Sequence, residues 1–190
     1  MIAFSSVAQI GYIYMGIGMG IEEGYVAAVF HIVHHAATKA LLFISVVGLS
    51  NVSGGSKLFP DLRGAGYRHK VAGIAFTVGS LSMVGIPMFS GFISKYLFAT
   101  AALEANPKKV FLTLGVLAIS TILNAIYFIH TVVTIYTPVE KEHPEYETRT
   151  LKDRPWVTYS LFAFILLNIV LGVFSQPVVD LITQGLRMFG

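Results

Sequence analysis

Long apolar segments alternate with short polar ones along most of the chain. Four of the apolar segments reach the roughly 20 residues that a helix needs to cross a bilayer. They cover about residues 2–20, 25–50, 110–136 and 156–175. Between the second and third, residues 51–70 are rich in glycine and polar residues and read as a loop. The pattern predicts transmembrane helices joined by short connections.

A further apolar segment, Val71 to Leu103, is too long for one simple span and carries helix-breaking residues at its middle. Gly85-Ile86-Pro87 removes a backbone donor and lowers helix stability there. We predict a helix from Val71 to about Ile86, a break near Gly85–Gly91, and a helix from about Phe89 to Leu103. Non-helical backbone inside a membrane is tolerated only where protein or water covers it. Other helices are therefore expected to cover the break.

Composition supports this interpretation. Hydrophobic residues make up 55% of the 190 residues and charged residues 12%, whereas soluble domains average about 25% charged. We predict an all-α fold: a polytopic transmembrane bundle of about six helices forming a single membrane domain over residues 1–190. A charged loop at 137–154 precedes the closing helix, about 156–175. A short tail follows, expected to be an amphipathic helix on the surface.

Charge and cysteine content exclude several classes of protein. The net charge is +3, but most cations lie beside apolar spans, where lysine and arginine commonly flank membrane helices. Nucleic acid is therefore not an expected partner. The chain has no cysteine, which excludes disulfides, thiolate metal sites and iron–sulfur clusters. No cofactor is expected.

The most informative motif is FHIVHHAATKALLF, residues 30–43. His31, His35 and Lys39 are spaced four apart, so they form a ladder along one helix face, with His34 about 60° to the side. Lys39 lies near the middle of its span, where a charge costs about 2.5–3.5 kcal/mol even on insertion scales. A lysine stacked over imidazoles that titrate near neutral pH is typical of a proton relay.

Two other interpretations of this motif exist. The histidines could only hydrogen-bond neighbouring helices while Lys39 pairs with a carboxylate. Alternatively, His31 and His35 could ligate zinc through one helix face. Aspartate and glutamate are absent from the neighbouring spans, so the ligand set would be incomplete and no metal is predicted.

A second motif, GIPMFSGFISKYLF, places Lys95 directly after the predicted break. Broken helices near the membrane midplane are recurrent ion sites in transporters. The alternative is a simple kink, with Lys95 reaching the membrane interface. His130, inside the apolar segment IYFIHTVVTIY, is a secondary candidate together with His34.

These motifs resemble one family in order along the chain. The segment from His31 through Lys39 to Phe43, then DLRG at 61–64, GIP at 85–87 and FSGFISK at 89–95, resembles the antiporter-like proton-translocating subunits. Such subunits occur in respiratory complex I, Mrp sodium/proton antiporters and membrane-bound hydrogenases. The opening AFSSVAQIGY at 3–12 also resembles a helix of that family.

The resemblance implies two inverted five-helix repeats, of which this chain would be the second (about 2–136) plus a closing helix. Lys39 would be the central relay lysine, Lys95 the lysine of the broken helix, and His31 and His35 would bridge water chains. Other membrane subunits would be partners, including one that supplies the first repeat. Redox motifs are absent, so electron transfer would belong to partner subunits of an NADH/quinone- or ferredoxin-linked oxidoreductase, if the complex is not a multisubunit antiporter.

Two functional hypotheses follow. The first is a proton-translocating, or sodium/proton-exchanging, subunit or half-subunit of a complex in a bacterial or archaeal cell membrane. The alternative is a structural membrane subunit whose buried lysines form static pairs. The first predicts that Lys39 and Lys95 point into one polar, hydrated layer at mid-membrane depth, with His31 or His35 oriented into it.

Overall fold

The computed structural model describes residues 1–105, 107–139 and 155–188, and the regular structure in these ranges is entirely helical. The helices are α1 (Ile2–Met19), α2 (Glu22–Asn51), α3 (Ala65–Arg68), α4 (Lys70–Val84), α5 (Ser90–Glu104), α6 (Pro107–Tyr136), α7 (Pro155–Val173) and α8 (Gln176–Arg187). α1, α2, α6 and α7 are each long and apolar enough to cross a membrane, and α4 is a shorter apolar helix. The predicted all-α transmembrane bundle is confirmed.

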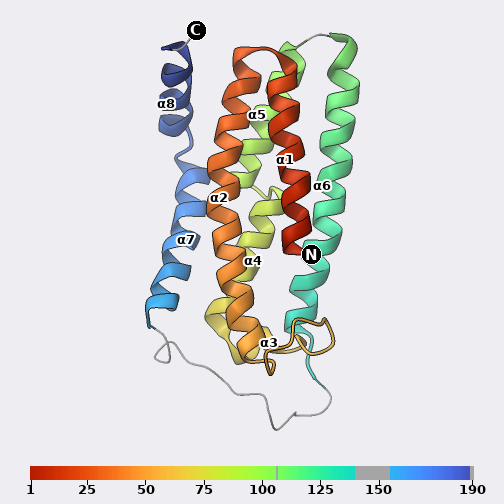
Figure 1. Cartoon of the computed structure of the whole chain (residues 1–190), viewed down its shortest axis with the longest axis vertical. Helices are drawn as coiled ribbons and strands as arrows, with labels where there is room; N and C mark the ends of the chain where they lie inside the picture. The colour runs from red at the N-terminus through yellow and green to blue at the C-terminus, as the bar shows by residue number, and fades with distance from the viewer. Residues whose placement is uncertain (106, 140–154, 189–190) are drawn as a thin grey trace.

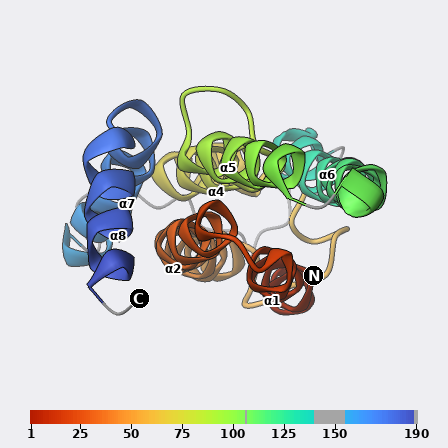
Figure 2. The same ribbon diagram turned by 90° about the horizontal axis from the view of Figure 1, so that it is seen from above.

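The long helix α2 is the centre of the bundle. α1 lies antiparallel to it on one side, while α4 and α5 follow one another along a second side (Figure 1). Seen from above, α7 and α8 lie on the flank opposite α1, and α6 lies at the far end of the α4–α5 layer (Figure 2). Residues on different faces of α2 therefore meet different helices.

Local sequence sets the boundary between α1 and α2. α1 ends at Gly20, whose φ of 70° is left-handed and suits a residue without a Cβ. α2 then begins with Glu22 and Glu23 in its first turn, where carboxylates are favoured by the positive end of the helix dipole. The two helices thus form a tight antiparallel pair.

The predicted break is present between α4 and α5. α4 ends at Val84, Gly85 has a φ of 90°, and Met88 has a φ of 81°, which is unusual for a residue other than glycine. α5 begins at Ser90. The chain between them leaves the helical path, so backbone groups are freed within an apolar part of the protein.

α7 covers part of this break. A Cβ added to Gly172 would lie 2.2 Å from the carbonyl oxygen of Met88 and 2.6 Å from the carbonyl carbon of Phe89. Only glycine allows α7 to approach this closely. The side chains of Ile86 and Met88 remain 40% and 68% exposed, so the cover lies on the backbone at the end of the break rather than on these side chains.

The peripheral segments add two features. The polar segment 51–70 contains the four-residue helix α3, which the hydrophobic pattern does not predict. Helix α8 runs beside the N-terminal half of α2 (Figure 1), and Arg187 Nε lies 2.8 Å from Glu22 Oε1. The charged loop predicted at 137–154 lies outside the described residues from 140 onward.

We expect Gly172→Ala to destabilise the protein by about 1–3 kcal/mol, the usual cost of overpacking a tight contact. The added methyl group would collide with the backbone of Met88. The midpoint of thermal unfolding in detergent measures the effect. Gly115→Ala in α6 is the matched control, since no atom lies within 4 Å of its added Cβ. Equal midpoints for the two variants would contradict the contact between α7 and the break.

Candidate functional site

Two histidines of α2 face two serines of α5. His31 Nδ1 lies 2.7 Å from Ser94 Oγ, and His34 Nδ1 lies 2.8 Å from Ser90 Oγ. All four side chains are buried. Because 31 and 34 are one turn apart on α2, and 90 and 94 are one turn apart on α5, the two pairs form successive rungs between the helices.

Asn168 of α7 joins the second rung to both sides of the helix break. Its Oδ1 accepts hydrogen bonds from Thr38 Oγ1 at 2.7 Å, Ser82 Oγ at 3.0 Å and Ser90 Oγ at 3.1 Å. Thr38 Oγ1 also lies 3.2 Å from His34 Nδ1. Residues of α2, α4, α5 and α7 thus share one buried polar cluster, the Asn168 cluster, formed by His34, Thr38, Ser82, Ser90 and Asn168.

A glycine makes this cluster compact. A Cβ on Gly91 would lie 1.7 Å from the carbonyl oxygen of Ser82 and 3.1 Å from His34 Cε1. The first distance is impossible for a real side chain, so glycine is required where α5 crosses the end of α4. The same missing side chain leaves room for the His34 ring.

Lys95 reaches back across the break. Its ammonium donates a 2.6 Å hydrogen bond to the carbonyl oxygen of Val84, the last residue of α4. A carbonyl at a helix C-terminus lacks an intrahelical donor and carries the negative end of the helix dipole. Gly85 lets the lysine stem pass, since a Cβ there would lie 2.9 Å from Lys95 Cδ.

Lys39 faces α1 instead. Its ammonium donates to the carbonyl oxygen of Ile2 at 2.6 Å and also to the hydroxyl of Ser5. Ser5 in turn donates to the same carbonyl at 2.8 Å. The side chain is 6% exposed, so a buried lysine is held by neutral oxygen atoms. No carboxylate pairs with it among the described residues.

The ladder predicted on α2 brings His31 and His35 together. The angle between their ring planes is 11° and their centroids lie 6.1 Å apart, so the rings are stacked. Within the described part of the chain, His31 Nε2 and His35 Nδ1 are buried and have no hydrogen-bond partner. Buried polar atoms are normally paired with protein or water. Each of these two nitrogen atoms can therefore bind a water molecule or a proton.

His130, the remaining candidate, lies apart from these residues. It is exposed on α6, with its ring 5.4 Å from that of Phe59 in an edge-on contact. No group of three or more histidine, aspartate or glutamate residues able to hold a metal ion occurs in the described ranges.

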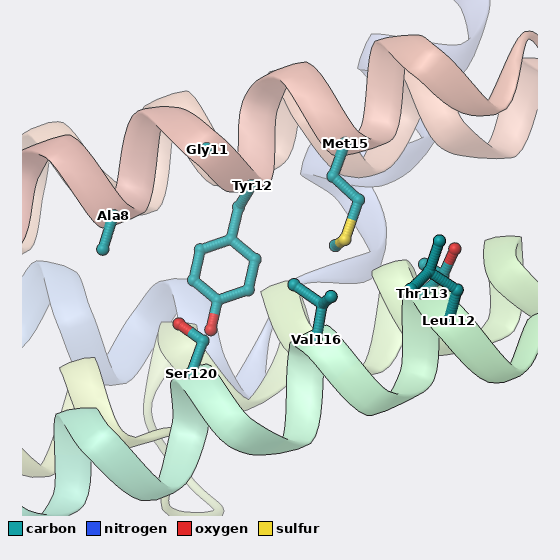
Figure 3. Close-up of a pocket in the computed structure, with 8 residues that line it drawn as sticks. All are labelled: Ala8, Gly11, Tyr12, Met15, Leu112, Thr113, Val116 and Ser120. Atoms are coloured by element: carbon teal, nitrogen blue, oxygen red, sulfur yellow. The ribbon is translucent and has the colours of Figure 1, made fainter.

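Tyr12 separates the histidines from a groove between α1 and α6. Its ring lies 5.3 Å from His31 on one side. On the other side it lines a groove of about 310 Å³ and points toward Ser120 (Figure 3). The groove residues are Ala8, Gly11, Tyr12, Met15, Leu112, Thr113, Val116 and Ser120. Its walls are mostly apolar, and the Tyr12 ring, with Phe98 stacked against it, lies between this groove and His31.

Sequence reasoning missed several polar residues of the candidate site. Ser94, Ser90, Thr38 and Asn168 contact the predicted histidines directly or through one another. The available signal was a small polar residue within an apolar span, since such residues often hydrogen-bond across transmembrane helices. That signal does not name the partner, because it depends on which helices meet.

The structure is a bundle of several helices long enough to cross a membrane, with a broken helix next to Lys95 and a second buried lysine, Lys39, on α2. Residues 1–128 match the model of a family described as NADH:quinone oxidoreductase/Mrp antiporter, transmembrane. The chain belongs to this family, which confirms the resemblance seen in its motifs.

Known proteins agree with this assignment. NADH-quinone oxidoreductase subunit N from Desulforudis audaxviator is 30% identical over 195 residues, which cover 97% of this chain and 38% of that protein. A chain of the Mrp complex from Dietzia sp. superposes with a TM-score of 0.80 at 23% identity, covering 96% of this chain and 41% of that one. A chain of respiratory complex I from Thermus thermophilus gives 0.69 at 23% identity, covering 94% and 38%. This chain thus spans well under half the length of the relatives it matches.

We expect Ser94→Ala to lower stability by about 1–3 kcal/mol, because it leaves a buried ring nitrogen of His31 without a partner. The midpoint of thermal unfolding in detergent tests this. Ser160→Ala is the control, since that exposed hydroxyl bonds only the Trp156 carbonyl of its own helix. If both substitutions shift the midpoint equally, the His31–Ser94 bond contributes nothing specific.

Proposed function

We propose that this chain is a proton-translocating subunit, or half-subunit, of a larger membrane complex. The proton path runs along Lys39, His35, His31 and Ser94 to Lys95. One observation carries the proposal: the two ring nitrogens without partners, His35 Nδ1 and His31 Nε2, belong to stacked histidines on the α2 face that also carries Lys39, and His31 contacts Ser94, the residue before Lys95.

The chemistry of each residue suits this path. A neutral imidazole donates through one nitrogen and accepts through the other, so it can pass a proton across its ring. His31 already uses Nδ1 with Ser94, whose neighbour is Lys95. The ring centroids of His31 and His35 are 6.1 Å apart. A bridging water would connect their nitrogens, as waters connect polar groups that are too far apart for direct bonding.

The lysines would serve as the two ends of the path. Each ammonium is bound to a backbone carbonyl, Ile2 for Lys39 and Val84 for Lys95. We propose that both ends open onto one hydrated layer at mid-membrane depth, since a lysine facing lipid there is strongly disfavoured. Moving one charge across 100 mV involves about 2.3 kcal/mol. Exchange of a few hydrogen bonds around either lysine could supply that energy.

Other polypeptides would supply the rest of the translocating unit. We propose that residues 2–136 form the second of two inverted five-helix repeats, with α7 as a closing helix, and that other membrane subunits supply the first repeat. The relatives are subunits of quinone oxidoreductases, and the matched structures are those of an Mrp complex and respiratory complex I. We place the complex in a bacterial or archaeal cell membrane, with electron transfer or sodium exchange depending on its partners.

Lys39→Ala is expected to lower proton translocation at least tenfold while the chain still assembles into its complex. The reason is that removing the ammonium ends the path at His35. Proton uptake by inverted membrane vesicles, followed with a pH-sensitive dye, measures transport. The amount of assembled complex on a native gel measures assembly.

Lys57→Ala is the matched control, because Lys57 is exposed in the loop after α2. It should leave both readings unchanged. If Lys39→Ala reduces assembly and translocation in equal proportion, Lys39 has the structural role of the alternative hypothesis. Normal translocation in that variant would also refute the path.

A further inference from the structure

The hydrogen bonds of the Asn168 cluster define which atoms carry protons. Asn168 Nδ2 donates to the Phe164 carbonyl at 2.9 Å. Rotating the amide would place two carbonyl-type oxygens against each other, so the orientation of the amide is fixed. Oδ1, which can only accept, therefore faces the hydroxyl groups of Thr38, Ser82 and Ser90.

Asn168 Oδ1 competes with His34 for the hydroxyl protons of Thr38 and Ser90. Each hydroxyl has a single proton. The distances of 2.7 and 3.1 Å allow Thr38 and Ser90 to donate their protons to Asn168 Oδ1. Hydroxyls that donate to Asn168 present a lone pair to His34 Nδ1, at 3.2 and 2.8 Å. A lone pair facing Nδ1 requires that Nδ1 carry the hydrogen.

The other side of the ring agrees. All of the His34 hydrogen bonds found among the described residues run through Nδ1. If the hydrogen were on Nε2, the buried ring would hold an N–H group without an acceptor. Such a group is rarer and more costly than an acceptor that lacks a donor. His34 as a whole is 2% exposed, so bulk water has little access to the ring.

We propose that Asn168 is a positioning residue that holds His34 as the Nδ1–H tautomer, leaving the Nε2 lone pair as a proton acceptor. No hydrogen bond joins Asn168 to the imidazole in the described ranges, and Asn168 acts through the hydroxyls of Thr38 and Ser90. The tautomer follows from the cluster alone. The use of Nε2 as an additional proton site beside the His31–His35 row rests on the proposed function.

The ¹⁵N spectrum of histidine tests the assignment directly, because protonated and unprotonated ring nitrogens resonate in separate regions. The full chain, labelled at histidine and reconstituted in lipid bilayers, contains six histidines. The signals that disappear in His34→Gln belong to His34. We expect a protonated Nδ1 and an unprotonated Nε2 in the unmodified protein.

Asn168→Leu removes the acceptor and keeps the branching and the number of side-chain heavy atoms. The freed hydroxyl protons should then turn toward His34 Nδ1, and the signals should move to the Nε2–H pattern. Asn124→Leu is the matched control: Asn124 is equally buried in α6 and bonds Tyr127, not the cluster. It should leave the His34 signals unchanged.

A protonated Nε2 with a bare Nδ1 in the unmodified protein would overturn the proposal, and this measurement needs only the His34→Gln variant, for signal assignment. An unchanged His34 pattern in a folded Asn168→Leu protein would overturn it as well. Neither readout involves transport. A failed proton path would therefore leave the tautomer result standing, and a wrong tautomer would leave the Lys39 result standing.

Discussion

The break between α4 and α5 is the constraint around which the other helices are arranged. It frees backbone carbonyls and amides in a segment that lipid cannot hydrate, where each uncovered group costs several kcal/mol. The protein covers this backbone from three directions. Lys95 bonds the last carbonyl of α4, Gly172 brings α7 against the far end of the break, and Asn168 bonds hydroxyls from both sides of it. Lys95 and the polar residues of the Asn168 cluster therefore lie beside the irregular backbone of the break.

Helix α2 carries two polar rows that differ in how completely they are bonded. One row, Thr38 and His34, is tied to the Asn168 cluster, in which every hydroxyl has a partner. The other row, His31, His35 and Lys39, contains two ring nitrogens without partners among the described residues. A saturated network is rigid, whereas an unsaturated one can take up water and protons. The partnered hydroxyls of the Asn168 cluster therefore suit holding the break, whereas the ring nitrogens without partners suit the proposed transport.

The sequence predicted the spans and the break well, because both depend on local properties. Apolar length defines a transmembrane helix, and Gly85 with Pro87 ends one regardless of what packs against it. The partners of the charged residues could not be predicted in this way. Ile2 and Ser5 meet Lys39 only because α1 folds back along α2. His130 occupies an apolar run as His31 does, yet it lies exposed beside Phe59, because its face of α6 meets the loop before α3.

The two rows also explain why one helix can serve both purposes. Residues 34 and 38 lie roughly 60–100° around α2 from the middle of the row of 31, 35 and 39. Thr38 therefore meets α7 while Lys39 meets α1, although His31 and His34 both reach α5. In the proposed path, a proton arriving at His35 adds charge to the row of His31 and Lys39, while the hydroxyls that hold the break stay bonded to the neutral amide of Asn168. An aspartate in that position would place a second charge beside the path and alter its energy with every proton that passed. A neutral acceptor in a dry cluster keeps the geometry of the break independent of the protonation of the neighbouring row.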